Sequence, residues 1–438
     1  MYWLNFTCLS DLSIHLYIWG NWSNIHKQEG KSKYICIILR TQNHKYMKIL
    51  IVDDQELVLL SLEKCLTDLG YEVKSSNNVF DAIAKYDEFL PNLVIADINM
   101  PVFNSTTQAD QTIDNNAKAA GLEIVKYIKV IKKHDIPVMI LSGNNDEDVI
   151  LKGFELGVSD YMKKPLSLNE IGARVKRLIG VSKESSINND NRLIQNNCIG
   201  VVIPCYNEES RLSSDEFKKF VHKNLGYHLC FVNDGSKDKT LEVLQELRKG
   251  KEDYISIFDC EKNGGKAEAV RLGMLHLAKQ TQFDYIGFLD ADLSTNFEDF
   301  ADLVQTISNS NYEIVSGSRI NRMGADIAKE SARAIISKTI NFIIRKTLGM
   351  DFKDTQCGAK IMSKEVIEKT FQKKFLTKWL FDVEIFMRMR NIYGLEETKK
   401  MVCEKPLNRW VHMDGSKLSF KDSFQIIFQI GQIAIYYK

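Results

Sequence analysis

Five aspartates stand at the ends of apolar runs of the kind that form buried strands. Asp53 and Asp54 follow KILIV, Asp97 follows LVIA, and Asp290 follows YIGFL with Asp292 two residues further on. Carboxylates held close together repel one another unless a hard cation neutralises them, and oxygen ligands suit Mg²⁺. These residues therefore predict two separate metal centres.

The elements around the first three carboxylates alternate between two patterns. Apolar runs occur at 48–52, 93–96 and 138–141, and an amphipathic stretch lies at 57–69. Short apolar runs favour buried parallel strands, and strands that alternate with helices predict a doubly wound α/β sheet. Ligands bind such sheets at the carboxyl ends of the strands, so we expect the three carboxylates to converge there.

Two further polar groups follow later strands of the same unit. Ser142 comes after the run at 138–141, and Lys164 precedes Pro165 further along the chain. A single aspartate at a loop start is usually only solvated. Three aspartates with a serine and a lysine behind them argue against that interpretation.

The motifs VDD at 52–54, ADINMP at 96–101, LSG at 141–143 and DYMKKP at 160–165 resemble the response-regulator receiver family over the whole unit, 47–180. The resemblance implies a flavodoxin-like fold, Mg²⁺ as cofactor, and a sensor histidine kinase or phosphotransfer protein as partner. It also implies the phosphoacceptor Asp97, the metal-site residues Asp53, Asp54, Asp97 and Asn99, and the switch residues Ser142, Lys164 and Tyr161.

A phosphoryl group on Asp97 adds strong acceptor oxygens, which would draw Ser142 and Lys164 inward while Tyr161 rotates. One departure from the family is a polar insert at 105–120, where a helix normally starts sooner. Surface insertions cost little, which favours an inert, solvated flap. Altered phosphorylation or dephosphorylation rates are the alternative.

A second unit begins near residue 198. Apolar runs at 199–204, 228–232 and 285–289 are each followed by polar motifs, respectively CYNEE, NDGSKDKT and DAD. An acidic triplet alone is a weak signal because such triplets are common in loops. Its position after a buried strand, behind two similar motifs, predicts that Asp290 and Asp292 flank one cation.

The second unit resembles the inverting family 2 glycosyltransferases of the GT-A (Rossmann-like) fold, and most of all the dolichyl-phosphate β-glucosyltransferases among the polyprenyl-phosphate enzymes. The motifs that carry the closer resemblance are NGGKAEAVRLG at 263–273, GSR at 317–319, DTQCGAK at 354–360, KWLFDVE at 378–384 and DGSKL at 414–418.

This resemblance implies a nucleotide-sugar donor, which we expect to be UDP-glucose, and Mg²⁺ or Mn²⁺ at Asp290 and Asp292. The metal would neutralise the departing diphosphate. The implied donor-binding residues are Pro204, Tyr206, Glu208, Asp234 and Lys266. Family members often have Asp in place of Asn233 and Gly in place of Ala267, which leaves the donor less certain but not the metal.

The resemblance also implies the residues of the acceptor side, which are Arg319, Arg333 and Ser337. Arg333 and Ser337 lie one helical turn apart. Two guanidiniums and a hydroxyl suit the phosphate of a polyprenyl phosphate. Such a phosphate is already ionised at neutral pH, so the reaction requires no strong base. Asp382 and Glu384 are candidates for organising the acceptor side, and we count Glu384 among the catalytic residues, with a structural role as the alternative.

The composition argues against a partner that binds through the overall charge of the chain. Lys and Arg total 58 and Asp and Glu total 57, so we expect no nucleic-acid partner. The nine cysteines show no C-x-x-C spacing, which fits the cytoplasm. The C-terminal stretch 419–438 is too polar to span a bilayer, and either lies on a membrane surface or docks on the catalytic domain.

We divide the chain into an unassigned extension at 1–46, a receiver domain at 47–180, a linker at 181–197 and the transferase at 198–438. The hypothesis is a phosphorylation-regulated inverting transferase that moves glucose to polyprenyl phosphate, cytoplasmic or peripheral at the inner face of the membrane. The alternatives are a family 2 transferase with a protein or glycan acceptor, and a signalling adaptor that senses a nucleotide sugar without turnover.

Overall fold

The computed structural model describes residues 5–7, 13–15, 47–100, 120–143, 147–180, 192–320, 326–327, 331–410 and 420–437. The predicted insert at 105–120 lies outside the described residues except for Ala120. The chain divides into two compact units, Met1–Met47 and Lys48–Lys438. In the first unit, strands β1 (Asn5–Thr7) and β2 (Ser13–His15) pair antiparallel.

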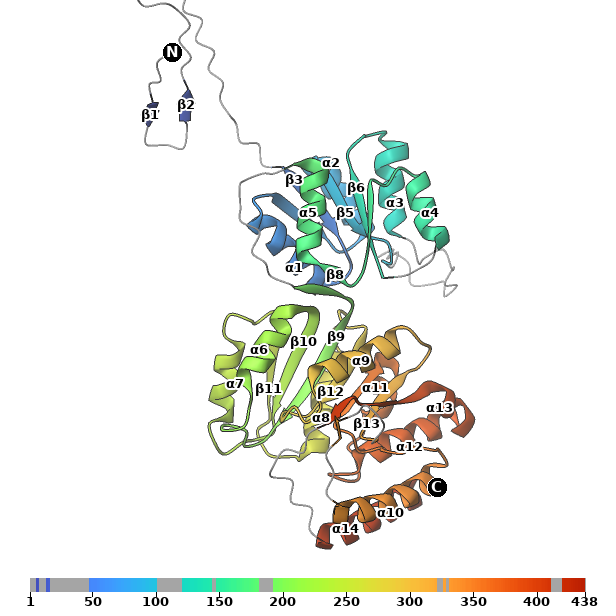
Figure 1. Cartoon of the computed structure of the whole chain (residues 1–438). Coiled ribbons are helices and arrows are strands. Elements are labelled where there is room, and N and C mark those ends of the chain that lie inside the picture. The colour runs from blue at the N-terminus through green and yellow to red at the C-terminus, as the bar shows by residue number, and fades with distance from the viewer. Residues whose placement is uncertain are drawn as a thin grey trace, which may run out of the picture. The chain divides into compact units, whose positions relative to one another are not determined.

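The first half of the larger unit is built on a five-stranded parallel sheet in the order β4-β3-β5-β6-β7 (Figure 1). Its strands are β3 (Lys48–Val52), β4 (Glu72–Ser76), β5 (Leu93–Asp97), β6 (Val138–Ser142) and β7 (Asp160–Lys163). All neighbouring strands run parallel. The predicted doubly wound sheet is confirmed, and its order places β3 and β5, which end in the acidic residues, side by side.

Helices connect these strands and cover both faces of the sheet. They are α1 (Glu56–Asp68), α2 (Val79–Phe89), α3 (Gly121–Lys126), which continues as the π-helical turn η3 (Tyr127–Ile131), α4 (Glu147–Glu155) and α5 (Leu168–Ile179). Helix α1 packs beside α5, and α2 packs beside α3. Strands β5 and β6 are buried along their whole length, as continuous apolar runs in a parallel sheet must be.

The second half is built on a mixed sheet in the order β11-β10-β9-β12-β15-β13-β16, with the short β8 (Leu166–Ser167) paired to the start of β9. Its strands are β9 (Leu193–Cys205), β10 (Asn224–Asn233), β11 (Ile255–Asp259), β12 (Tyr285–Leu289), β13 (Ile314–Ser318), β15 (Ala359–Ser363) and β16 (Val402–Pro406). Strand β15 is antiparallel to both neighbours, whereas β9, β10, β11 and β12 are parallel. A small parallel pair joins β14 (Asp326–Ile327) to β17 (Arg409–Trp410).

Helices form a layer on each face of this sheet (Figure 1). They are α6 (Ser214–Lys223), α7 (Thr240–Arg248), α8 (Lys266–Ala278), α9 (Phe297–Ser308), α10 (Ser331–Leu348), α11 (Lys364–Thr370), α12 (Phe381–Tyr393), α13 (Leu395–Met401) and α14 (Phe420–Tyr436). The alternation along β9 separates two cores: Val201 and Ile203 pack with α6 and α9, and Val202 packs with α8 and α12.

One boundary differs from the sequence prediction. Strand β9 begins at Leu193, inside the range 181–197 that we assigned to a linker, and residues 181–191 lie outside the described part. The pairing of Leu193 and Ile194 with β8 and β10 gives these polar-flanked residues ladder partners. Sequence alone does not reveal such partners, because they come from distant segments.

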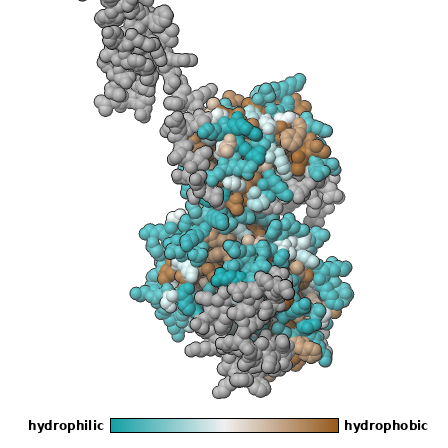
Figure 2. All heavy atoms as spheres, viewed as in Figure 1, coloured by the Kyte–Doolittle hydropathy of each residue, from teal (hydrophilic) through white to brown (hydrophobic). Residues whose placement is uncertain are grey.

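Hydrophilic residues cover most of the described surface on the face drawn in Figure 2. Against that background, α10 and α14 pack against each other and expose large apolar side chains. Each of four apolar residues in these two helices exposes more than half of its surface; the four are Phe342, Phe428, Ile435 and Tyr436. Among the described helices, none is both long enough and apolar enough to cross a membrane.

Candidate functional site

Three carboxylates meet where β3 and β5 end. Oxygens of Asp53, Asp54 and Asp97 all lie within 4.8 Å of one another. The Nζ atom of Lys164 donates to Asp53 Oδ2 at 2.8 Å and to Asp97 Oδ2 at 2.9 Å. Parallel strands bring their carboxyl ends to one edge, which is why residues so far apart in sequence converge. The cluster has the oxygen donors that a divalent cation requires.

Burial disfavours the charged form of these acids. It raises the pKa of Asp53 to about 7, with Lys164 opposing the shift and Asp97 adding to it. Burial and the neighbouring Asp97 also raise the pKa of Asp54 to about 6. Crowded, partly desolvated carboxylates of this kind are stabilised by added positive charge, as Mg²⁺ would supply.

The other predicted residues of this site lie around the acids. The Asn99 backbone N–H donates to Asp97 Oδ1 at 3.1 Å, and Asn99 Nδ2 donates to Ser142 Oγ at 3.4 Å. Ser142 is buried, whereas Tyr161 on β7 is partly exposed to solvent. The structure therefore brings Asp53, Asp54, Asp97, Asn99, Ser142 and Lys164 together. The predicted rotation of Tyr161 stays a prediction.

The second acidic pair follows β12. Asp290 forms an ion pair with Lys266, the first residue of α8, and Asp292 accepts a hydrogen bond from the Ser294 backbone N–H at 2.9 Å. Gly358 packs so closely against the Asp290 carboxylate that a Cβ atom at residue 358 would overlap it. Lys266, predicted to contact a diphosphate, thus lies beside the predicted metal ligand.

The predicted donor pocket lies at the ends of β9 and β10. Asp234 accepts backbone hydrogen bonds from Gly264 at 2.7 Å and Gly265 at 2.9 Å. Burial raises the pKa of Asp234, and these two N–H groups oppose the shift. The segment NGGK therefore wraps around a carboxylate, and Gly265, at φ +86°, has a backbone conformation that favours glycine.

The remaining donor residues line the same edge. Pro204 is in β9, and Tyr206 is the first residue after that strand. Tyr206 exposes 41 % of its surface. Glu208 accepts from Arg211 at 2.6 Å and 3.1 Å, and its carboxylate repels that of Asp292. Burial raises the pKa of Glu208, and the Asp292 carboxylate makes a smaller contribution in the same direction.

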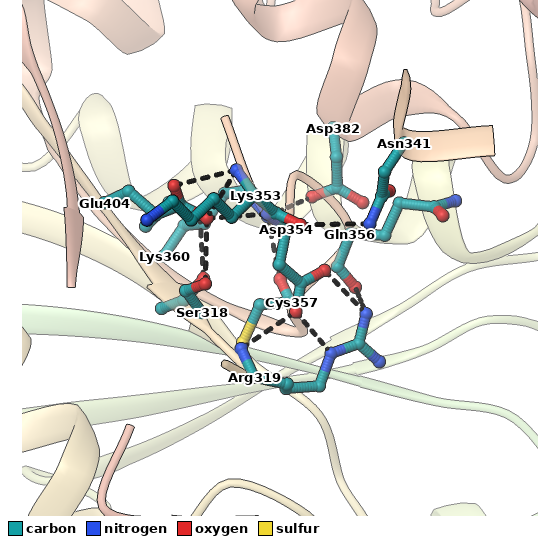
Figure 3. Close-up of polar contacts among 12 residues, drawn as sticks. Ser318, Arg319, Asn341, Lys353, Asp354, Gln356, Cys357, Lys360, Asp382 and Glu404 are labelled. Carbon is teal, nitrogen blue, oxygen red and sulfur yellow. Dashed lines mark hydrogen bonds and ion pairs between the residues drawn. The ribbon is translucent and has the colours of Figure 1, made fainter. Parts of the chain in front are cut away.

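Arg319, predicted to bind the acceptor phosphate, follows β13 and is bonded to Asp354 (Figure 3). The guanidinium lies 5.3 Å from the centre of the Trp410 ring. Burial would lower the pKa of Arg319, but Asp354 and, more weakly, Asp290 raise it above its usual value. Arg319 therefore stays charged.

The two other predicted acceptor residues, Arg333 and Ser337, belong to α10, and their side chains lie outside the described residues. Glu384 is fully buried in α12. Its carboxylate accepts from the Leu376 backbone N–H at 2.8 Å, from Arg388 Nη2 at 2.7 Å and from the Tyr437 hydroxyl at 2.7 Å. This arrangement favours the structural alternative that we gave for Glu384 over a catalytic role.

Sequence reasoning assigned no role to three charged residues beside the site. Asp354 accepts hydrogen bonds from Arg319, and Glu404 accepts them from the backbone N–H groups of residues 353 and 354 (Figure 3). The buried Lys360 donates to Asp382 Oδ1 at 2.6 Å and to the Cys357 carbonyl at 2.7 Å. The motif DTQCGAK contains Asp354 and Lys360. It therefore indicated that this segment matters, but not which residues these two side chains contact.

Two family models match the chain. A model described as glycosyl transferase family 2 matches residues 200–371, and one described as response regulator receiver domain matches residues 49–176. The chain is 31 % identical over 259 residues to dolichyl-phosphate beta-glucosyltransferase of Dictyostelium discoideum, which covers 56 % of this chain and 76 % of that protein. It is 30 % identical over 235 residues to the human dolichyl-phosphate beta-glucosyltransferase, covering 50 % and 69 %.

Two solved structures are also similar. Glucosyl-3-phosphoglycerate synthase from Mycobacterium tuberculosis, in complex with UDP, has a TM-score of 0.40 at 18 % identity, covering 54 % of this chain and 80 % of that one. The Vibrio cholerae chemotaxis protein CheY4 has a TM-score of 0.26 at 23 % identity, covering 30 % of this chain and 98 % of that one.

Proposed function

Because this chain belongs to glycosyl transferase family 2 and carries a response regulator receiver domain before its transferase domain, we propose that it transfers glucose from UDP-glucose to a polyprenyl phosphate, under the control of phosphorylation at Asp97. The observation that carries the proposal is that Asp290, which is paired with Lys266, and Arg319 follow β12 and β13, two strands that run in the same direction and end at one edge of the sheet. Two cations beside an acidic pair suit two phosphate-bearing substrates.

The donor side binds and neutralises the nucleotide. Asp290 and Asp292 are the residues that would hold Mg²⁺ or Mn²⁺, which stabilises charge on the departing diphosphate. Tyr206, Glu208 and Asp234 bind the nucleoside, with Pro204 shaping the same edge. The ammonium of Lys266 lies beside Asp290 and adds positive charge where the leaving group develops negative charge.

The acceptor side requires little acid–base chemistry. A phosphate monoester has lost most of its second proton at neutral pH, so its oxygen attacks the anomeric carbon directly. The bond from that carbon to the diphosphate oxygen breaks as the new bond to the acceptor oxygen forms, and UDP leaves with the electron pair. A single displacement inverts the configuration, and Arg319, Arg333 and Ser337 orient the attacking phosphate.

The receiver accepts a phosphoryl group from a sensor histidine kinase or a phosphotransfer protein. Asp54, Asp97 and the Asn99 carbonyl would hold Mg²⁺ there, and Asp53 supports the cluster from behind. Lys164 donates to Asp97, and Ser142 accepts from Asn99, so both side chains would contact phosphoryl oxygens on Asp97. The added charge biases a two-state face of the domain, and Tyr161 follows it.

A polyprenyl acceptor resides in a membrane, so the enzyme must work at a membrane surface. We assign this contact to the exposed apolar side chains of α10 and α14, because such residues favour the interface between headgroups and acyl chains. We place the chain in the cytoplasm, where kinases and nucleotide sugars are found, peripheral at the inner membrane face.

The direct test supplies labelled UDP-glucose and a polyprenyl phosphate in membranes to the full-length chain. We expect label in the organic extract, released by mild acid, and none with Asp290→Ala. Label that remains in the protein or aqueous fraction would instead identify a protein or glycan acceptor. UDP-glucose binding by calorimetry without any turnover would support a sensing adaptor and overturn the enzyme assignment.

A further inference from the structure

We propose that Asp354 is a positioning residue for the acceptor arginine, and that Glu404 fixes Asp354 in turn. This inference rests on the proposed function, because it assigns to Arg319 the recognition of an acceptor phosphate. It extends that function to two acidic residues that touch neither the sugar nor the metal.

The contact between Asp354 and Arg319 sets the plane of the guanidinium. Nε of Arg319 donates to Asp354 Oδ2 at 2.7 Å, and Nη2 donates to Oδ1 at 2.8 Å. The backbone N–H of Arg319 also donates to Asp354 Oδ2, at 2.9 Å. Two parallel bonds to one carboxylate fix the fork in a single orientation, which one bond or a lysine cannot do.

Burial strengthens this constraint. Asp354 exposes only 5 % of its surface, and the arginine is also packed on the Trp410 ring. The Gln356 carbonyl accepts a further bond from Arg319 Nη2 at 3.2 Å. A partly buried, charge-assisted pair is less screened by salt than an exposed one, so the guanidinium keeps this orientation before any acceptor arrives.

Glu404 of β16 holds Asp354 through the backbone. Its carboxylate accepts from the Asp354 N–H at 2.6 Å, from the Lys353 N–H at 2.9 Å and from the Ser318 hydroxyl at 2.8 Å (Figure 3). Ser318 directly precedes Arg319 in the chain. One carboxylate thus joins the backbone that carries the arginine to the backbone that carries its partner.

The same loop reaches the metal side of the site. Four residues after Asp354, Gly358 ends the loop and packs on the Asp290 carboxylate, and Lys360 in the following strand β15 donates through Nζ to the Cys357 carbonyl. The loop therefore holds the acceptor arginine at one end and touches the metal ligand at the other. Prepositioned groups of this kind lower the entropy cost of bringing two substrates together.

The test replaces Asp354 by Asn, which keeps the size of the side chain but removes its charge. We expect the KM for a polyprenyl phosphate to rise about tenfold, whereas the KM for UDP-glucose changes by less than about twofold. The matched control is Asp351→Asn, which breaks a solvent-exposed ion pair with Arg345 close to the same loop and is expected to change neither value.

A double-mutant cycle separates positioning from simple loss of structure. If Asp354 acts through the arginine, Asp354→Asn combined with Arg319→Lys raises the acceptor KM no more than Arg319→Lys does alone. Additive effects, an unchanged acceptor KM in Asp354→Asn, or an equal loss for donor and acceptor would overturn the proposal.

Binding provides a readout that does not require transfer. Micelles containing farnesyl phosphate, compared with micelles containing farnesol, measure phosphate recognition directly. We expect wild-type protein to prefer the phosphate and Asp354→Asn to lose most of that preference. If wild-type protein prefers the phosphate but transfers no glucose to it, the proposed function fails. If wild type transfers glucose and the variant binds as well as wild type, only the positioning role fails.

Discussion

At Gly358, the absence of a side chain is what allows the loop to touch Asp290. A Cβ atom there would overlap the carboxylate, which would have to move from its place beside Lys266. Gly358→Ala should therefore weaken UDP binding in the presence of Mn²⁺ by at least about tenfold, measured by calorimetry. Gly431→Ala in α14, where a Cβ atom meets open space, is the control and should bind UDP as wild type does. Unchanged UDP binding by Gly358→Ala would show that the carboxylate tolerates displacement.

Lys164 is the buried cation of the receiver site. Removing it in Lys164→Ala leaves Asp53 and Asp97 buried without their shared partner, which should lower the stability of the receiver by about 3 kcal/mol in the absence of divalent cations. Mg²⁺ replaces the lost charge, so it should restore protection more in the variant than in wild type. Hydrogen-exchange mass spectrometry resolves this domain within the full chain.

The control for that experiment is Lys163→Ala, because Lys163 is the exposed neighbour on β7. It should match wild type with and without Mg²⁺. An identical response to Mg²⁺ in Lys164→Ala and wild type would contradict a shared electrostatic role for Lys164 and the cation.

The acidic residues that follow buried strands could be predicted from the sequence. The residues that position other side chains of the site could not. Asp53, Asp54 and Asp97 follow strands whose burial shows in their apolar sequences, so their convergence follows from topology. Asp354 and Glu404 gain their partners from segments 35 and 86 residues away, in contacts to Arg319 and Ser318. No local pattern encodes such pairs.

Among the elements, the buried strands that end in the acidic motifs were found with little error, whereas the buried strands β13 and β15 were not predicted. The predicted runs at 48–52 and 285–289 are β3 and β12, because a strand covered on both faces must be apolar throughout. Strand β4, EVKSS, gave no such signal, since it lies at the sheet edge and its side chains are largely accessible. The early start of β9 was missed because its first residues gain their ladder partners from β8 and β10, which are distant in the sequence.

The loop between α11 and α12 is held by an arginine and not by regular secondary structure. Arg388 donates to the carbonyls of Thr370 at 2.5 Å, Lys373 at 2.7 Å and Lys374 at 2.7 Å, and pairs with Glu384. Arg388→Met leaves these carbonyls without that donor and removes the cationic partner of the buried Glu384 carboxylate, which keeps the Leu376 N–H and the Tyr437 hydroxyl. We expect a loss of about 3 kcal/mol in stability and faster amide exchange at 371–376.

Lys373→Met provides the comparison for this loop, because that side chain is exposed on the same segment. It should leave both stability and exchange unchanged. If Arg388→Met exchanged at the wild-type rate in this loop, the carbonyl contacts would not be what orders it.

On the scale of the whole molecule, composition revealed little and motifs revealed much. The near-zero net charge argued against a nucleic-acid partner, and two sets of strand-end motifs identified a receiver and a transferase in one chain. The orientation of Arg319, the predicted acceptor arginine, could not be predicted, because it depends on the carboxylate of Asp354, which the fold brings to it.

The proposed function requires that the phosphorylation state of the receiver changes the rate of transfer. The most direct measurement is the initial rate of lipid-linked glucose formation by the purified full-length chain, with and without acetyl phosphate and Mg²⁺, in wild type and in Asp97→Asn. The account predicts that transfer occurs in both proteins and that acetyl phosphate changes the rate in wild type alone. Absence of transfer, or equal rates in wild type with and without acetyl phosphate, would contradict it.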